Sequence, residues 1–160
     1  MTDINMRPFA AADKAWLVEQ HSIRYAMDEG FDATFGPLVD DILTDFLAHH
    51  DPDCEAGWVA EKQGQRLGSI FCVRLGEKTA KLRLFFLLPQ ARGKGLGKRL
   101  LATCMEFARS RGYKDMSLWT HESHTAACAL YTSQGWACVA SKPVHSFGVD
   151  LIEQSWHVDL

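Results

Sequence analysis

One stretch of the chain, LFFLLPQARGKGLGKRLL at residues 84–101, constrains its fold more than any other. An unbroken apolar run ends at Pro89, three glycines then alternate with other residues among cations, and a helical apolar pattern starts directly afterwards. A strand that passes through a glycine-rich turn into a helix points several backbone N–H groups one way, with the partial positive charge of the helix N-terminus behind them. The stretch therefore predicts an anion-binding loop.

The spacing of this loop excludes two well-known phosphate loops. A Walker A loop needs four residues between its glycines and a hydroxyl residue after the lysine, whereas three residues separate Gly93 from Gly97 and Arg99 follows Lys98. A dinucleotide-binding loop needs a third glycine at the position of Lys98. The glycines at 93, 95 and 97 still let the backbone approach a phosphate closely, and positive charge comes from Arg92, Lys94, Lys98 and Arg99.

Apolar periodicity predicts the elements around the loop. Segments with helical spacing alternate with segments of period two, and Gly-containing turns join the three central strands into an antiparallel meander. Ser123 is the expected N-cap of the last helix and Gly135 its stop. We expect the order β-α-α-β-β-β-α-β-α-β-β, with strands at 4–9, three within 57–89, 115–120, 136–141 and 149–160, and helices at 10–31, 35–47, 96–112 and 123–135.

This order predicts an α/β (α+β) domain built on one mixed sheet. The strand, helix and strand between residues 80 and 120 require two neighbouring parallel strands with a right-handed crossover, inside a sheet that is otherwise antiparallel. The run 84–88 is wholly apolar, so we expect it to be covered on both faces. No repeat, linker or low-complexity tract divides the 160 residues, and we therefore expect a single domain over 1–160.

Charge and hydropathy narrow the class of function. The net charge of -3 gives little support to a nucleic-acid partner, but residues 25–61 hold ten acids and no Lys or Arg, while residues 78–114 hold ten bases and one acid. One region attracts cations and the other anions. The longest apolar run is far shorter than the roughly 20 residues of a membrane helix, and the N-terminus has no signal-peptide core. We expect no membrane partner and a cytoplasmic location.

The cysteines and histidines do not predict a metal site. Five cysteines without a C-x-x-C pair favour reduced core residues over a disulfide framework or a zinc ribbon. The HESH segment at 121–124 spaces its histidines three apart, one short of the zinc-protease motif. The HHDPDC segment at 49–54 offers ligand atoms but is more simply a turn. We expect no metal.

Four segments carry a resemblance to a known family. PQARGKGLGKRLL resembles the acetyl-coenzyme A loop of the GNAT superfamily of N-acetyltransferases, [QR]-x-x-G-x-[GA], with Arg92, Gly95 and Gly97 at its fixed positions. HTAACALYTSQGW resembles the superfamily's N-x-x-A-x-x-x-Y-x-x-x-G-[FW] pattern, although His124 stands where Asn is usual. KLRLFFLLP and HSFGVDL are similar to acetyltransferase domains of MarR-type fusion regulators. The likeness covers most of the chain and implies a GNAT-like fold, with the parallel strand pair at the cofactor cleft.

By this resemblance, acetyl-CoA is the co-substrate and a primary amine in a small molecule or a peptide is the acceptor. The loop N–H groups would hold the pyrophosphate, and the preceding strand would pair with the pantetheine arm. The acidic segment would border the acceptor pocket, which favours a cationic amine. The implied cofactor-binding residues are Phe85, Phe86, Leu87, Arg92, Gly93, Lys94, Gly95, Leu96, Gly97 and Lys98.

Tyr131 is the candidate catalytic residue. A phenol with a pKa of about 10 can protonate a departing thiolate whose conjugate acid has a pKa of about 8.5. Many family members carry a carboxylate base on the strand before the loop, but this strand holds Lys81 and Arg83 and no acid. A non-catalytic acyl-CoA sensor is therefore the alternative function. The sequence leaves open the acceptor, the acyl chain length, the oligomeric state, a homodimer included, and the general base, which is water, His121, Glu122 or His145.

Overall fold

The computed structural model describes residues 3–160 and confirms the expected order of elements. Short 3-10 turns precede α1 and follow β4. The elements are β1 (Ile4–Pro8), α1 (Lys14–Glu29), α2 (Phe35–His49), β2 (Ala56–Lys62), β3 (Gln65–Arg74), β4 (Thr79–Leu87), α3 (Leu96–Ser110), β5 (Asp115–His121), α4 (Thr125–Ser133), β6 (Ala137–Ser146) and β7 (Val149–Asp159).

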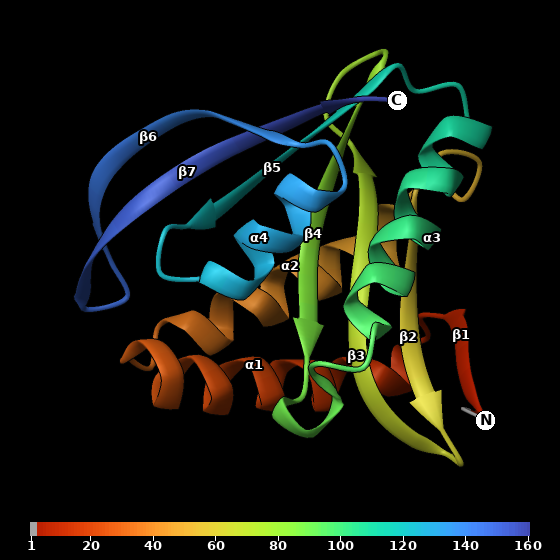
Figure 1. The fold of residues 1–160 in the computed structure, drawn as a ribbon. Coiled ribbons are helices and arrows are strands. Elements are labelled where there is room, and N and C mark those ends of the chain that lie inside the picture. The colour runs from red at the N-terminus through yellow and green to blue at the C-terminus, as the bar shows by residue number, and fades with distance from the viewer. Residues whose placement is uncertain (1–2) are drawn as a thin grey trace.

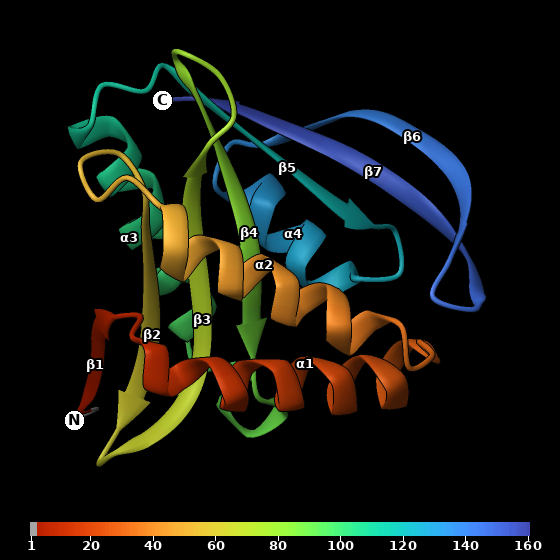
Figure 2. The same cartoon turned by 180° about the vertical axis from the view of Figure 1, so that it is seen from behind.

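The strands form one mixed sheet with the order β1-β2-β3-β4-β5-β7-β6. All neighbours pair antiparallel except β4 and β5, which confirms the expected parallel pair. Helices α3 and α4 lie on the face of the sheet toward the viewer in Figure 1, and α1 and α2 lie on the opposite face, as Figure 2 shows from behind. The fold is thus a three-layer arrangement of helices, sheet and helices.

The parallel pair separates soon after it begins. Only Thr79 to Lys81 of β4 pairs with β5, opposite Asp115 to Ser117. Both cartoons show the two strands diverging beyond this point, with α4 lying between them (Figures 1 and 2). The carboxyl-terminal half of β4 therefore has no strand partner on its β5 side within the described residues.

A bulge interrupts β4 at the same place. The register between β3 and β4 shifts between Ser69 and Phe71, and Leu84 adopts a positive φ of 51°. The Ser69 hydroxyl donates a hydrogen bond to the carbonyl of Leu84 at 2.8 Å, which fixes the bulge. A bulge re-aims the side chains that follow it. Phe86 then packs toward α1 and Phe85 toward α4, so the apolar run is covered on both faces as expected.

Apolar side chains of the helices bury the two faces of the sheet. On one face, Leu96, Leu100 and Cys104 of α3 have no more than 1% of their surface exposed, because their spacing of four residues places them on one side of the helix. On the other face, Leu17 of α1 and Leu43 of α2 pack against the sheet. All five cysteines are free thiols. Cys72 and Cys104 are buried as expected, whereas Cys54 and Cys128 are only half-buried and Cys138 is exposed.

Two details differ from the sequence-based expectation. His124, and not Ser123, is the N-cap of α4, because the turn after β5 carries Ser123 outside the helix. Strand β6 extends to Ser146 because it pairs with β7 along its whole length in a long hairpin. Among residues 3–160, no helix is both long enough and apolar enough to cross a membrane.

Candidate active site

The glycine loop joins the end of β4 to the first turn of α3. Gly93 and Gly95 have φ of 76° and 79°, a region that non-glycine residues rarely adopt, and Gly95 is the N-cap of α3. A Cβ built on either glycine meets no atom within 4 Å, so the loop backbone faces open space. Among residues 3–160, no protein acceptor takes a hydrogen bond from the N–H groups of residues 93–98. These donors are available to an anion.

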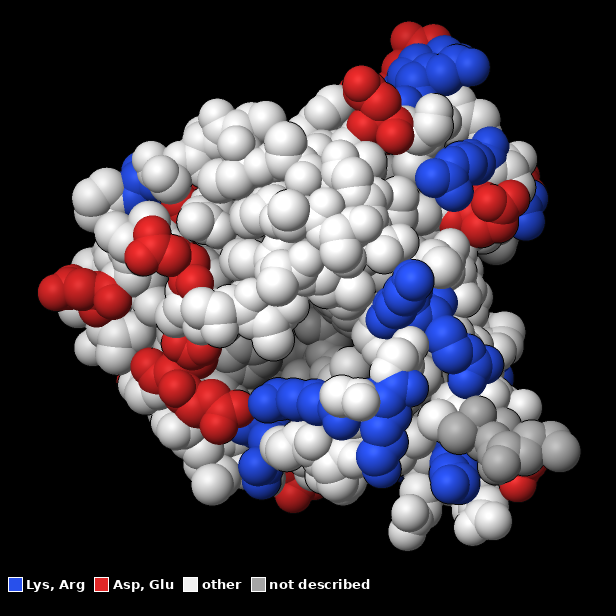
Figure 3. Space-filling model, in the orientation of Figure 1, with Lys and Arg blue, Asp and Glu red and all other residues white. Residues whose placement is uncertain are grey.

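Positive charge surrounds this backbone. Arg92, Lys94, Lys98 and Arg99 are all exposed. The Arg92 side chain reaches back along β4, where Nε donates to the carbonyl of Leu87 at 3.3 Å, and it lies 3.8 Å from Asp28 of α1. Figure 3 shows a group of Lys and Arg side chains along one side of a hollow in the molecular surface. The structure thus brings the predicted loop residues into one cationic rim.

Residues 85–87 lie on the part of β4 that has separated from β5. Phe86 is 4% exposed and packs against His21 of α1, with the ring centroids 4.6 Å apart. Gly97 of α3 sits close to this strand, since a Cβ there would lie 3.3 Å from the Leu87 side chain. The predicted loop and strand residues are therefore adjacent in space, although not all of their side chains face the cleft.

Tyr131 of α4 faces the same strand from the other side of the gap. Its ring centroid lies 6.2 Å from that of Phe85 and 5.8 Å from those of Trp136 and Trp156, and only 4% of the residue is exposed. Burial raises the pKa of Tyr131 well above its ordinary value, with a smaller contribution from Tyr25. The phenol is therefore protonated throughout the neutral range, and the same burial makes it a weaker acid than a free phenol.

The carboxyl-terminal end of α1 adds residues that the sequence did not single out. Tyr25 packs 5.3 Å from the ring of His124, and burial together with the charge of Glu29 raises the pKa of Tyr25 to about 12. Glu29, one helical turn further on, lies 3.1 Å from His124 Nε2. Two features of the sequence point to these residues. Tyr25 and Glu29 are four positions apart, and they lie at the start of the acidic segment 25–61. Neither feature shows that the two side chains face α4.

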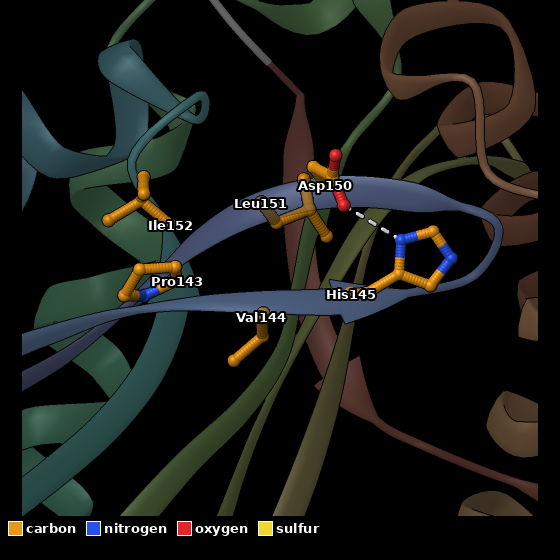
Figure 4. Close-up of a pocket in the computed structure, with 6 residues that line it drawn as sticks. All are labelled: Pro143, Val144, His145, Asp150, Leu151 and Ile152. Carbon is orange, nitrogen blue, oxygen red and sulfur yellow. Dashed lines mark hydrogen bonds and ion pairs between the residues drawn. The ribbon is translucent and has the colours of Figure 1, made fainter.

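The three candidate bases have different surroundings. His121 is half-buried at the end of β5, its ring lies 5.5 Å from that of His124, and burial lowers its pKa. Glu122 is exposed in the following turn. His145 is exposed on the β6–β7 hairpin, where its Nδ1 lies 2.8 Å from Asp150 (Figure 4). Of the three, His121 is the one that the structure places against the ring of His124.

Two open cavities lie elsewhere on the surface. One of about 440 Å³ is formed by the β6–β7 hairpin and lined by Pro143, Val144, His145, Asp150, Leu151 and Ile152 (Figure 4). Another of about 470 Å³ is lined by residues of α3 together with Trp58. Neither is lined by the glycine loop or by Tyr131. The first contains the His145–Asp150 pair, whose two side chains are both exposed to solvent.

One group of metal-ligand atoms occurs among the described residues. Side-chain atoms of Asp115, His157 and Asp159 all lie within 4.8 Å of one another at the start of β5 and the end of β7. His157 Nε2 is 3.1 Å from Asp115 Oδ2, whereas Asp115 Oδ1 is buried without a hydrogen-bond partner among the described residues. The group lies at the opposite end of β5 from His121 and contains no residue of the loop.

Comparison with known proteins assigns the family. The profile of the Acetyltransferase (GNAT) family matches residues 17–136. This chain belongs to that family, as the glycine loop indicated. Families of this kind take the acetyl group from acetyl-CoA, and the open N–H groups of the loop fit its phosphates.

Curated relatives match part of the chain. Mouse N-acetyltransferase 8 is 36% identical over 108 residues, which make up 64% of this chain and 44% of the relative. Rat N-acetyltransferase 8 is 34% identical over 108 residues, or 64% of this chain and 46% of the relative. The chain therefore spans less than half the length of these relatives.

Solved structures share the whole fold. An acetyltransferase from Streptococcus agalactiae superimposes with a TM-score of 0.78 at 21% identity and covers 100% of both chains. A putative acetyltransferase from Salmonella typhimurium, determined with its cofactor acetyl-CoA, gives a TM-score of 0.75 at 22% identity over 98% of this chain and 94% of that one. At these identities the likeness establishes the fold.

Proposed function

We propose that this chain transfers the acetyl group of acetyl-CoA to a cationic primary amine. The observation that carries the proposal is the divergence of β4 from β5 beyond Lys81, with the glycine loop following the end of β4 and Tyr131 of the intervening α4 packed against Phe85 (Figure 1). An extended, negatively charged thioester fits a gap that has open backbone donors at one end and a proton donor further in.

The loop end of the gap would bind the phosphates. The N–H groups of residues 93–98 are free of protein acceptors among the described residues, and the α3 dipole adds partial positive charge behind them. Arg92, Lys94 and Lys98 are exposed beside them. Backbone donors provide direction and the side chains provide long-range attraction for an anion.

The exposed backbone of β4 would hold the pantetheine arm. Within residues 3–160, residues 85–87 have no strand partner toward β5, so the backbone groups that point away from β3 can pair with an amide-containing chain as an added strand would. One N–H of this segment would also stabilise negative charge on the thioester oxygen during attack. The bulge at Leu84 fixes the direction of these groups.

Tyr131 would return a proton to the leaving thiolate. When the amine nitrogen bonds to the thioester carbon and the C–S bond breaks, the sulfur takes a proton from the phenol. The phenol recovers a proton from the nitrogen that has become the amide. Burial keeps Tyr131 protonated until that moment.

The acceptor side of the gap would favour a positive charge. Asp28 and Glu29 at the end of α1 and Asp32 in the following loop come from the acidic segment, and Figure 3 shows acidic side chains to the left of the hollow, next to the end of the Lys and Arg group. A lysine side chain, a protein N-terminus, a polyamine or an amino sugar carries the matching charge.

The other expectations remain part of this proposal. They are a single domain over 1–160, a cytoplasmic location, and a likeness to the acetyltransferase domains of MarR-type fusion regulators. We also expect no metal and no nucleic-acid or membrane partner, and either a monomer or a homodimer. None of them enters the chemical argument.

A thiol-release assay tests the proposal. Acetyl-CoA is supplied with spermidine, a lysine-containing peptide or glucosamine, and a neutral amide such as acetamide serves as the negative control. We expect at least one amine to accelerate thiol release and to appear as an acetylated product by mass spectrometry. If acetyl-CoA binds while no amine stimulates release, the chain is a non-catalytic acyl-CoA sensor and the enzymatic proposal is wrong.

A further inference from the structure

A carboxylate and an imidazole meet where the end of α1 approaches the start of α4. Glu29 Oε1 and His124 Nε2 lie 3.1 Å apart, and their side chains are only 14% and 18% exposed. Glu29 is the last residue of α1, and His124 is the N-cap of α4. Among residues 3–160, Glu29 has no Lys or Arg partner. A largely desolvated carboxylate that has no cationic partner in the protein favours the binding of a cationic ligand.

His124 is the N-cap of α4 and lies seven residues before Tyr131, so one short helix connects the two residues. Tyr25 of α1 packs against His124, with the ring centroids 5.3 Å apart. The Glu29–His124 pair therefore lies where α1 meets the start of the helix that carries the proposed proton donor.

The contacts of His124 fit both of its neutral tautomers. Thr120 Oγ1 lies 3.2 Å from Nδ1 and can accept an N–H from it. Nε2 is buried and lies 3.1 Å from Glu29 Oε1, but among residues 3–160 it has no partner with hydrogen-bond geometry. With the ring proton on Nε2, its N–H is directed at the carboxylate. With the ring proton on Nδ1, the Nε2 lone pair and the carboxylate oxygen are neighbouring acceptors for one shared donor.

Charged groups of every neighbouring element act on His124. Glu29 and Asp28 of α1 favour its protonated form, whereas His121 of β5 and Arg92 of the loop oppose it. Burial has the largest effect and lowers the pKa of His124 below its ordinary value of 6.5. The neutral ring is therefore ready to accept a proton at neutral pH, and Glu29 would stabilise the cation formed.

We propose that Glu29 and His124 are the ammonium-binding residue and the general base of the acceptor site. This inference rests on the proposed acetyl transfer. It supplies the base that β4 lacks, since that strand carries Lys81 and Arg83 in place of an acid.

The proton balance follows directly. An acceptor R–NH3⁺ donates to Glu29 and to Nε2 of His124, and one proton moves to Nε2 to leave a neutral R–NH2. The nitrogen bonds to the thioester carbon, the C–S bond breaks, and the thiolate gains a proton from Tyr131, which recovers one from the new amide nitrogen. His124 then releases its extra proton to water. The net change is R–NH3⁺ plus acetyl-CoA to amide, thiol and one proton.

The test is the pH dependence of kcat/KM for spermidine in the wild type, His124→Asn and Glu29→Gln. In the wild type we expect a plateau at neutral pH that declines in acid as His124 takes up a proton. His124→Asn introduces the asparagine that is usual at this position of the family pattern, and it removes the proposed base. Its kcat/KM should follow the free-amine fraction and rise about tenfold per pH unit toward the pKa of the amine, about 10. A merely structural role would not produce this change of profile.

Glu29→Gln keeps the shape of the side chain and removes its charge. We expect KM for spermidine to rise about tenfold or more with a smaller change in kcat, because a charge-assisted hydrogen bond is lost from binding. In both variants the Kd of acetyl-CoA should stay within about twofold, which shows that the fold and the cofactor cleft are intact. His49→Asn is the matched control, since His49 of α2 is 75% exposed and should leave every parameter unchanged.

The outcomes separate this inference from the function on which it rests. If the wild type acetylates spermidine and both variants keep its kcat/KM and its pH profile, the Glu29–His124 assignment is wrong and acetyl transfer stands. If the wild type binds acetyl-CoA and acetylates no amine, the enzymatic function and this inference fail together.

Discussion

The two ends of α1 carry two sparsely exposed carboxylates with opposite surroundings. Asp13, just before the helix, is 1% exposed and accepts hydrogen bonds from Arg7 at 2.7 Å and from Arg66 at 2.8 Å. Glu29, at the other end, faces His124 and has no Arg or Lys partner among residues 3–160. Two arginines of the protein therefore neutralise the charge of Asp13, whereas no Arg or Lys among residues 3–160 pairs with Glu29.

This difference separates a structural ion cluster from a candidate binding group. Asp13 ties β1, β3 and the start of α1 together, and Arg7 also contacts Glu61 of β2. Nothing in that cluster is left for a ligand. Glu29 makes no such network, and it lies beside Tyr25 and His124 at the cleft. We expect changes at the Asp13 end to affect stability and changes at the cleft end to affect catalysis.

The largest expected effect is at Tyr131. Tyr131→Phe removes the phenol, and we expect kcat to fall about 100-fold or more while stability hardly changes, because the hydroxyl makes no hydrogen bond within residues 3–160. Tyr113→Phe is the matched control, since the Tyr113 hydroxyl donates to the carbonyl of Cys54 at 2.8 Å. That variant should lose about 1 kcal/mol of stability and keep its kcat. Full turnover in Tyr131→Phe would contradict the proposed acid.

Asp13→Ala should be the most destabilising change at the structural end. It removes the shared acceptor of Arg7 and Arg66, and we expect the free energy of unfolding to fall by about 2 to 3 kcal/mol, a cost limited because both guanidinium groups reach solvent. Urea denaturation measures the effect, with the exposed Asp53→Ala as control. Equal stability of the two variants would show that the cluster is not a structural anchor.

Acid should weaken the fold in two separate pH ranges. Burial lowers the pKa of His21 from 6.5 to about 4. Between these pH values the unfolded chain binds a proton at His21 that the folded chain does not, so stability falls as the pH is lowered from 6.5 to about 4. Burial alone would raise the pKa of Asp13, but its hydrogen bonds with Arg7 and Arg66 outweigh burial and lower it below 3.8. The stabilisation from Asp13 is therefore complete above about pH 4 and is lost as the pH falls further.

The variant Asp13→Asn separates these ranges. It should flatten the dependence of unfolding free energy on pH below about 4 and leave the dependence between 4 and 6.5 unchanged. Chemical denaturation at a series of pH values gives the comparison. An unchanged slope below pH 4 would mean that Asp13 does not have the lowered pKa that its partners impose.

The smallest expected effect on stability is at Glu29. Because the protein does not satisfy this carboxylate with a cation, Glu29→Gln should change the free energy of unfolding by no more than about 0.5 kcal/mol, or raise it slightly. The same variant is expected to impair amine binding. A loss of stability as large as that of Asp13→Ala would remove the contrast between the two ends of α1.

Local patterns in the sequence predicted most of the fold. The apolar run, Pro89 and the glycines define a strand, a loop and a helix within 18 residues, and all three form as expected. The parallel pair followed from chain connectivity, since a strand–helix–strand unit has few allowed arrangements. The positive φ of Leu84 was not predictable, because no residue preference signals a bulge at leucine.

The acceptor side of the site needed the three-dimensional structure. In the sequence, His124 is only a departure from the family pattern, and Glu29 is only one of the ten acids in residues 25–61. Their pairing joins residues 95 positions apart through the packing of α1 against the start of α4, and spacing along the chain carries no record of such a contact. His145 and Glu122 are candidate bases by the chemistry of their side chains alone. The structure leaves both exposed, whereas His124 is half-buried.

The most direct test of the central claim is a calorimetric titration of acetyl-CoA into the wild type, Gly95→Glu and Gly64→Glu. Both glycines have a φ of 79° and open space at Cβ, so the two substitutions impose the same backbone strain and the same charge at different places. We predict saturable binding to the wild type and to Gly64→Glu, and its loss in Gly95→Glu, where the added carboxylate would meet the phosphates. Binding of equal strength in all three proteins, or in none, would contradict the assignment of the loop.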